Sequence, residues 1–180
     1  TLFVLKTREF QDESSHSQFN LIATQAAALA NRDLAMRVVA LKGLVAEIES
    51  EDIDDDIKFD QHASIIRQTF PDFLAINRMN AERIITKVTP LQGNESALGR
   101  KVGQTSDIVS LLDDAEKSRE PRATDFVQLF QGGKGVAIYI PYYLDGHLAG
   151  FVNAVFRVEE VIRIATMSVD PTINIEMPLR

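Results

Sequence analysis

The first third of the chain has the hydrophobic pattern of a long helix. From Phe19 to Ile48 the sequence contains no Pro and a single Gly, and large apolar residues recur at mixed spacings of three, four, five and seven positions. Ala, a strong helix former, fills many of the positions between them. We predict a helix from about Glu9 to Glu49, weakest at residues 31–33, whose stripe of Ala and Leu suits a stalk or a dimer interface.

An acidic run, ESEDIDDD at residues 49–56, precedes a second helical segment at residues 57–69. One interpretation of this run is a calcium-binding loop, but it lacks the Gly and the terminal Glu of an EF-hand. The interpretation that we prefer is that its carboxylates cap the second helix and interact with the positive end of the helix dipole.

After Pro71 the pattern changes to short apolar runs that are typical of strands. Asp145-Gly146, between the two longest runs, strongly indicates a β-hairpin. A helix capped by Ser106 or Asp107 is predicted over residues 106–118, and a short one over residues 159–166. The predicted strands span residues 73–78, 83–89, 126–130, 136–143 and 148–158. We therefore predict an α+β fold, in which a long N-terminal helix is followed by a five-stranded antiparallel sheet with flanking helices.

The composition excludes several classes of function. Lys and Arg number 19 against 26 Asp and Glu, a formal net charge of −7, whereas a nucleic-acid partner requires a basic surface. The chain has no Cys, so disulfides, thiolate metal sites and Cys nucleophiles are excluded. It contains no apolar run of about 18 residues, the length that spans a bilayer. Because the sequence does not begin with Met, we expect it to be a segment of a longer protein.

Catalytic chemistry is not indicated by any motif. The three His fall in different predicted elements, and the glycine-rich run at residues 132–135 lacks the order of a phosphate-binding loop, so we interpret it as a turn. We therefore predict no enzymatic activity, no metal and no cofactor. The polar residues on the predicted strands next to an irregular loop suit a small-molecule pocket with a few polar anchors: Asn77, Arg78, Tyr139, Tyr142, Tyr143 and Asn153.

A long ordered motif gives the sequence a family likeness. The segment at residues 70–99, which ends in PLQGNESALG, resembles the core of the CHASE domain, and the runs LFQGGKG at residues 129–135, IPYY at 140–143 and GFV at 150–152 resemble the segments that follow it. The resemblance covers about residues 37–165. It implies a PAS-like fold in an extracytoplasmic sensor domain, on the periplasmic or extracellular side of the cell membrane.

The resemblance also implies a division of the chain and a parent protein. We expect a stalk helix over residues 1–50, a PAS-like sensor core over residues 51–167 and an exit segment toward the membrane over residues 168–180. The parent would be a membrane-anchored signal-transduction receptor, a histidine kinase or a diguanylate cyclase. Its catalytic domain would lie outside this chain, and the stalk helices of two copies would form a parallel homodimer.

One departure from the family pattern bears on the ligand. The family usually reads LGxD, whereas this sequence has Lys101 at the position of the acid and Arg100 beside it. We expect Lys101, with Arg78 and Tyr139, to face a pocket, and Arg100 to face solvent. A cation there needs an anion, and the interpretation that we prefer slightly is that an acid of the chain itself supplies it. The sharper hypothesis is that the carboxylate of a small organic acid or an amino acid does so as the ligand. The complete set of expected ligand-binding residues is Asn77, Arg78, Lys101, Ala123, Tyr139 and Asn153.

Two further expectations complete the sequence-based account. Asn94 and Glu95 should be structural, because the irregular loop at residues 90–103 must satisfy its own backbone groups; direct ligand contact is the alternative. The leading hypothesis for function is a ligand-sensing receptor domain. The alternatives are a dimerisation or interaction module with no small-molecule ligand, and a soluble enzyme on a PAS-like scaffold, for which the sequence offers no nucleophile or metal set.

Overall fold

A computed structural model of the chain describes residues 32, 34–50, 53 and 55–167. These residues fall into two units. Residues 36–161 form the larger unit, and residues 32, 34–35 and 162–167 belong to the other, in which residues 162–167 are the C-terminal part of helix α4 (Val158–Met167). No helix within these described ranges is long and apolar enough to cross a membrane.

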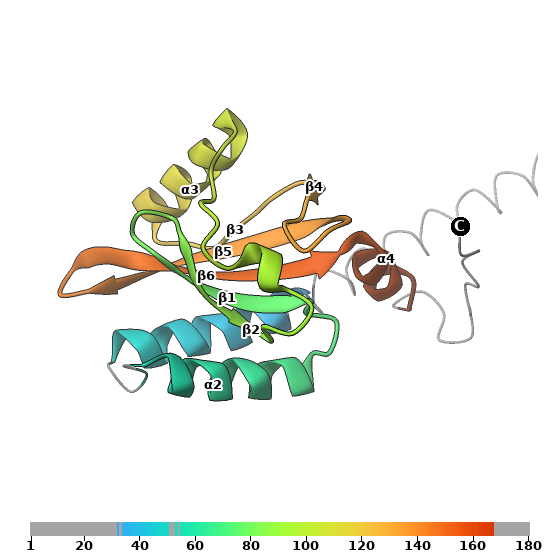
Figure 1. The fold of residues 1–180 in the computed structure, drawn as a ribbon, viewed down its shortest axis with the longest axis horizontal. Coiled ribbons are helices and arrows are strands. Elements are labelled where there is room, and N and C mark those ends of the chain that lie inside the picture. Colours follow the sequence, from blue (N-terminus) through green and yellow to red (C-terminus); the bar gives the residue numbers. More distant parts are fainter. Residues whose placement is uncertain (1–31, 33, 51–52, 54, 168–180) are drawn as a thin grey trace, which may run out of the picture. The chain divides into compact units, whose positions relative to one another are not determined.

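A six-stranded antiparallel sheet forms the centre of the larger unit (Figure 1). Its strand order is β2-β1-β6-β5-β3, and β4 also pairs with β5. The strands are β1 (Ala75–Asn80), β2 (Ile85–Thr89), β3 (Arg122–Ala123), β4 (Val127–Gln128), β5 (Lys134–Leu144) and β6 (His147–Arg157). The pairing register places Asn77 of β1 opposite Asn153 of β6, and Asn153 opposite Tyr139 of β5. Side chains in one such row share a face of the sheet, so strands far apart in sequence bring these three residues together.

The hairpin between β5 and β6 has the turn that the sequence predicts. Asp145 and Gly146 have φ angles of +51° and +79°, the pair of positive values that a two-residue type I′ turn requires. The two strands that it joins are each 11 residues long. In β6 residues 150–156 are all buried, so the middle of the sheet is covered on both faces.

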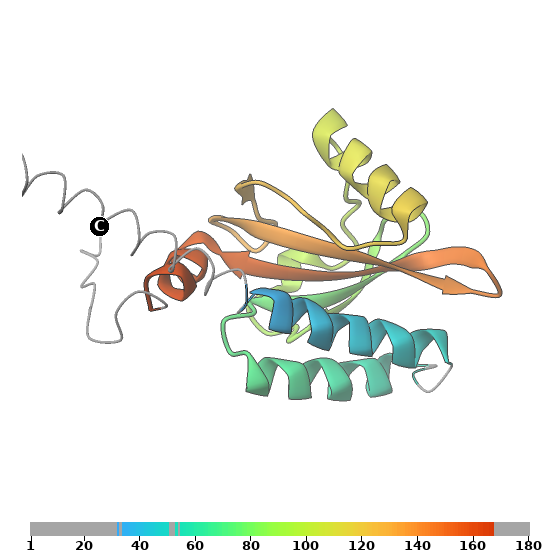
Figure 2. The same ribbon diagram turned by 180° about the vertical axis from the view of Figure 1, so that it is seen from behind.

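Helices cover the two faces of the sheet separately, as both views of the ribbon show (Figure 2). The helix at residues 36–49, drawn in blue, and α2 (Asp56–Thr69) lie against one face, whereas α3 (Ser106–Ser118) covers part of the other. Asp55 caps α2: its Oδ1 accepts hydrogen bonds of 2.8 Å from the backbone N–H groups of Ile57 and Lys58. This cap confirms the capping interpretation of the acidic run.

The predicted fold class is confirmed, and the differences are local. The sheet has six strands rather than five, because Arg122–Ala123, which we had not predicted as a strand, pairs with the edge of β5. The helix at residues 106–118 has the expected bounds, but its N-cap is Thr105 rather than Ser106 or Asp107. Residues 36–49 pack into the larger unit, whereas the rest of the predicted stalk before residue 32 and the exit segment at residues 168–180 lie outside the described residues.

A buried ion pair ties the N-terminal helix to the segment that leads into β1. Arg37 Nε and Nη2 donate to the two carboxylate oxygens of Asp72 over 2.7 and 3.1 Å. The Asp72 side chain is only 1% exposed, and the guanidinium of Arg37 also lies 5.1 Å from the centroid of the Phe70 ring. Bidentate geometry of this kind offsets the cost of removing two charges from water.

Replacing one partner of this pair should therefore destabilise the domain strongly. We expect Asp72→Ala to lower the free energy of unfolding by about 3–5 kcal/mol, because two charge-assisted hydrogen bonds to the buried guanidinium of Arg37 are lost. The matched control is Glu120→Ala, which removes the carboxylate of an exposed ion pair with Lys42, 2.8 Å long, and should cost at most about 1 kcal/mol. Urea denaturation of the three proteins measures both values, and equal losses in the two variants would contradict this account.

Candidate functional site

A cavity of about 310 Å³ lies between the sheet and the segments that cover the α3 face. Its floor is formed by β1, β5 and β6, and its walls by residues 102–105, the first turns of α3, and β4 with the turn after it. The lining residues are Asn77, Ile85, Val102, Gly103, Gln104, Thr105, Ile108, Val127, Gln128, Leu129, Phe130, Gln131, Ala137, Tyr139, Asn153 and Val155.

Two asparagine side chains form a fixed chain of hydrogen bonds on the floor. Asn153 Nδ2 donates to the backbone carbonyl of Ile138 over 3.1 Å, and Asn77 Nδ2 donates to Asn153 Oδ1 over 2.8 Å. Because a carbonyl only accepts, Ile138 fixes the orientation of the Asn153 amide, and Asn153 in turn fixes that of Asn77. The remaining polar atom of this pair, Asn77 Oδ1, has no hydrogen-bond partner among the described residues. It is nevertheless shielded from water, because Asn77 is 0% exposed.

Two other polar groups of the lining also lack a partner within the described part of the chain. Tyr139 is 6% exposed, and no protein group is hydrogen-bonded to its hydroxyl. Burial raises the pKa of Tyr139 above its ordinary value, so the hydroxyl stays protonated and remains a donor as well as an acceptor. The buried Nε2 of Gln131 is the third such group. A natural protein usually satisfies its buried polar groups, so the unpaired atoms of Asn77 and Gln131, two residues of one lining, indicate a site for a ligand or water.

The lining carries no formal charge among the described residues. Its polar members are amides, hydroxyls and backbone groups, and its other members are apolar or glycine. No group of three or more His, Asp or Glu in the described ranges is arranged to hold a metal ion. The cavity can therefore exclude water from a small molecule and bind it through neutral hydrogen bonds.

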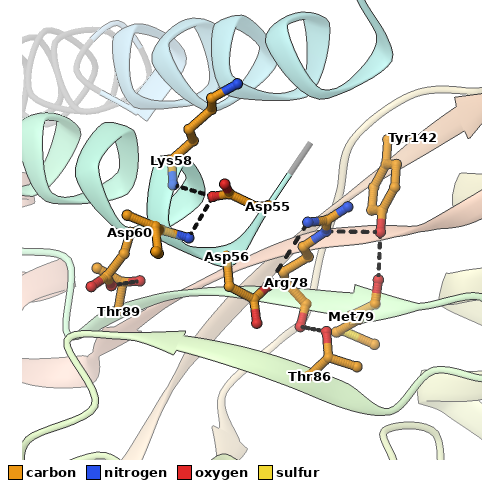
Figure 3. Close-up of polar contacts among 10 residues, drawn as sticks. Asp55, Asp56, Lys58, Asp60, Arg78, Met79, Thr86, Thr89 and Tyr142 are labelled. Carbon is orange, nitrogen blue, oxygen red and sulfur yellow. Dashed lines mark hydrogen bonds and ion pairs between the residues drawn. The ribbon is translucent and has the colours of Figure 1, made fainter. Parts of the chain in front are cut away.

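Three of the six residues expected at the site line this cavity: Asn77, Tyr139 and Asn153. Arg78 does not line it. Successive residues of a strand face opposite sides of a sheet, so Arg78 extends from β1 toward α2, as Figure 3 shows. There its Nε donates to the Tyr142 hydroxyl over 3.3 Å, and its Nη1 lies 3.9 Å from Asp56 Oδ1.

Lys101 and Ala123 also lie outside the lining. Backbone bonds pair residues 99–102 with the outer edge of the sheet near β2, and within this segment Val102 faces the cavity while Lys101 is exposed. Arg100 is exposed, as expected, and its Nε donates to the carbonyl of Ser96 over 3.2 Å. Ala123 is an exposed residue of β3. The structure thus does not bring Lys101, Arg78 and Tyr139 together in one pocket.

Most of the remaining polar residues of the lining have no recognisable signal in the sequence. Gln104, Thr105 and Gln131 come from segments without periodicity, and Gln128 from the two-residue strand β4; only the tertiary fold directs these residues to the cavity. Gln131 stands in the run that resembles the family, next to the glycine turn, and this position was the only available indication.

The side chains of Asn94 and Glu95 serve the backbone of their loop, as predicted. Asn94 Nδ2 donates to the carbonyl of Pro90 over 3.1 Å and to that of Leu74 over 3.5 Å. Glu95 Oε1 accepts a bond of 3.0 Å from the N–H of Gly93, and hydrogen bonds from the backbone of Glu95 and Gly93 hold the pKa of Glu95 below its ordinary value. Neither residue lines the cavity.

Solved structures with the same fold are sensor domains. The chain is similar to an extracellular ligand-binding receptor of Desulfohalobium retbaense (TM-score 0.72, 16% identity), covering 85% of this chain and 27% of that one. It is similar to the ligand-binding domain of the Pseudomonas aeruginosa amino acid chemoreceptor PctC, solved with GABA (TM-score 0.62, 15% identity). This match covers 84% of this chain and 68% of that one. The sensor domain of Escherichia coli DcuS also matches (TM-score 0.52, 16% identity), over 79% of this chain and 98% of that one. The chain thus spans about a quarter of the first protein and about two thirds of the second.

The sequence comparison identifies the family. No curated protein sequence matches the chain. The family model of the CHASE domain matches residues 17–178, which is most of the 180 residues. CHASE domains and the solved sensor domains are non-catalytic ligand-binding domains, in agreement with the predicted absence of enzymatic activity. The chain therefore belongs to the CHASE-domain family.

Proposed function

We propose that this chain is the extracytoplasmic ligand-sensing domain of a membrane-bound signal-transduction receptor, and that a small molecule binds in the cavity on the α3 face of the sheet. The observation that carries the proposal is the buried, unpaired Asn77 Oδ1 at the cavity floor. Leaving such an acceptor unpaired costs about 1–3 kcal/mol, and a ligand that donates to it recovers this free energy. Membership of the CHASE family and the fold shared with solved ligand-binding sensor domains support the proposal.

The ligand class that the neighbours suggest is an amino acid. Among them, PctC was solved with GABA, PctB with L-Arg and the Campylobacter jejuni chemoreceptor Tlp3 with isoleucine. Lys101 was expected to hold the carboxylate of such a ligand in this chain, but Lys101 is exposed and lies outside the lining. The similar sensor domains therefore favour an amino acid or a carboxylate as the ligand. The described lining, however, contains no charged residue that would pair with it.

The ligand signal would pass through the sheet to the N-terminal helices. Asn77, on the cavity face of β1, is adjacent to Arg78, which reaches Tyr142 and Asp56 on the opposite face (Figure 3). At the far end of the helix at residues 36–49, Glu49 Oε1 accepts a hydrogen bond of 2.9 Å from the N–H of Tyr143 in β5. A small shift of β1 or β5 on binding would therefore move both helices. The output domain, a histidine kinase or a diguanylate cyclase, would lie in the remainder of the receptor.

A pair of matched Tyr→Phe variants tests the cavity as the ligand site. A thermal-shift screen with amino acids, carboxylates, purines and neutral amides should find a compound that stabilises the wild-type domain, and calorimetry then gives its affinity. Tyr139→Phe removes a hydroxyl of the cavity lining that has no hydrogen-bond partner among the described residues, so we expect an affinity loss of about fivefold and little change in stability.

The control is Tyr142→Phe, on the opposite face. The Tyr142 hydroxyl donates to the carbonyl of Met79 over 3.1 Å and accepts from Arg78, so its loss should lower the free energy of unfolding by about 1 kcal/mol and leave ligand affinity unchanged. The proposal is contradicted if no compound stabilises the wild type, or if both variants bind the compound as the wild type does.

The second part of the proposal is a parallel homodimer through the N-terminal helix. Within residues 36–49 one face, including Leu41 and Leu44, is buried on the sheet. The opposite face exposes Met36, Val39, Gly43 and Ala46, at spacings of three, four and three. Apolar and small residues at this spacing are typical of the interface between two parallel helices. The alternative function, a dimerisation or interaction module without a small-molecule ligand, would use this same surface.

Single cysteines test the dimer directly, because the chain has no Cys of its own. In membranes that contain the full-length receptor, Val39→Cys and Ala46→Cys should form disulfide-linked dimers on mild oxidation, since residues at a parallel interface meet their own copies. Gln61→Cys, on an exposed position of α2, is the control and should cross-link far less. Cross-linking at neither position, or equally at Gln61→Cys, would refute the proposed interface.

A further inference from the structure

We propose that the ligand of the cavity is an uncharged molecule with an amide-type group, an N–H donor beside a carbonyl acceptor, attached to a small apolar body. This inference rests on the proposed function and specifies the ligand of the same cavity. It departs from the amino acids with which the similar sensor domains were solved.

The first step of the argument concerns charge. The described lining contains no Lys, Arg, His, Asp or Glu. A carboxylate or an ammonium that left water for this cavity would meet no opposite charge, and the effective penalty for such an ion is several kcal/mol even after relaxation. A zwitterionic amino acid would carry this penalty at both of its ends. The residues that were expected to supply a charge, Arg78 and Lys101, are directed away from the cavity.

The N-terminus of α3 is the one feature of the lining that would favour an anion. Thr105, its N-cap, lines the cavity and makes no side-chain capping bond. However, Asp107 in the first turn already places a carboxylate at this positive end of the helix. The helix dipole therefore does not replace the missing cationic side chain.

The second step concerns the hydrogen bond that the floor requires. The carbonyl of Ile138 fixes Asn153, and Asn153 fixes Asn77, so that the unpaired buried atom of Asn77 is an oxygen and not a nitrogen. A ligand that pairs with this atom must consequently supply a donor. Without a carboxylate in the lining, the donor that fits at least cost is a neutral N–H or O–H.

The third step concerns the groups around that donor. Gln131 contributes a buried amide nitrogen with no partner among the described residues, and Tyr139 contributes a protonated hydroxyl. Both can donate to an acceptor on the ligand. Ile85, Val102 and Leu129 supply apolar walls, whose contact with a ligand contributes about 25 cal/mol for each Å² removed from water. One molecule that satisfies these groups carries a donor and an acceptor on an apolar body, as an amide does.

Matched compounds that differ only in charge test the proposal. Benzamide, benzoate and benzylamine form one series, and pentanamide, pentanoate and pentylamine form a second; valine and GABA are added as amino acids. Calorimetry at neutral pH should show that the amide of at least one series binds the wild-type domain at least about tenfold more tightly than its charged counterparts, a difference of about 1.4 kcal/mol. The proposal is overturned if a charged compound or an amino acid binds more tightly than the amides, or if neither amide binds.

The pH dependence gives an independent readout. Tyr139 is the only titratable residue of the described lining, and burial raises its pKa. The affinity for the amide should therefore stay constant between about pH 5.5 and 8.5, a range in which an exposed His would change its charge. A change of more than about threefold across this range would reveal a titrating partner in the site and contradict the inference.

Two variants separate this inference from the proposed function. Asn77→Asp places a carboxylate on the floor and should shift the preference from benzamide toward benzylamine. Tyr139→Phe is the variant to use if Asn77→Asp fails to fold, because it retains the shape of the site. It should lower the affinity for benzamide about fivefold. A charged compound that binds the wild type better than the amides, and loses affinity in Tyr139→Phe, overturns the ligand class but leaves the cavity as the ligand site. If benzamide binds both variants as tightly as it binds the wild type, its site lies outside the cavity, and this result contradicts the proposed function as well.

Discussion

The need to bury both faces of the central strand β6 determines the arrangement of the larger unit. Residues 150–156 of this strand are all buried, so one layer of helices is insufficient. The helix at residues 36–49 and α2 cover one face, and the Arg37–Asp72 ion pair holds the first of them to the segment before β1. The other face is covered only in part by α3, and the remaining space, lined by residues 102–105 and 127–131, is the cavity. The site is therefore a consequence of how this face is covered.

Polar side chains interrupt the otherwise apolar floor of that face. Asn77, Asn153 and Tyr139 lie in one row across three strands, and the Ile138 carbonyl orients the two amides. A half-satisfied buried network is less stable than an apolar core. Here the network ends at a buried acceptor of a lining residue, and this acceptor has no hydrogen-bond partner among the described residues. The free energy that this arrangement costs the folded domain is available to a ligand that completes the network, which is why we assign it to binding and not to stability.

Sequence reasoning succeeded where a few neighbouring residues decide the structure. The Asp145-Gly146 turn and the backbone bonds of Asn94 follow from local chemistry, and the resemblance in the PLQGNESALG run identified the family. The alternation of side chains along a strand already implies that Asn77 and Arg78 cannot both face the cavity, although both were expected there. The position of Lys101, the pairing of Arg122–Ala123 with β5 and the inward orientation of Gln131 depend on long-range register, which periodicity does not contain.

The central claim is that a ligand completes the hydrogen bonds of Asn77. The side-chain amide signals of asparagine in a ¹⁵N NMR spectrum report on it most directly, because Asn77 and Asn153 lie in the site while Asn94, equally buried, lies outside it. Saturation with a ligand should shift the Nδ2 signals of Asn77 and Asn153 strongly and leave that of Asn94 in place. A ligand that binds the domain and leaves the signals of Asn77 and Asn153 unchanged would contradict the account.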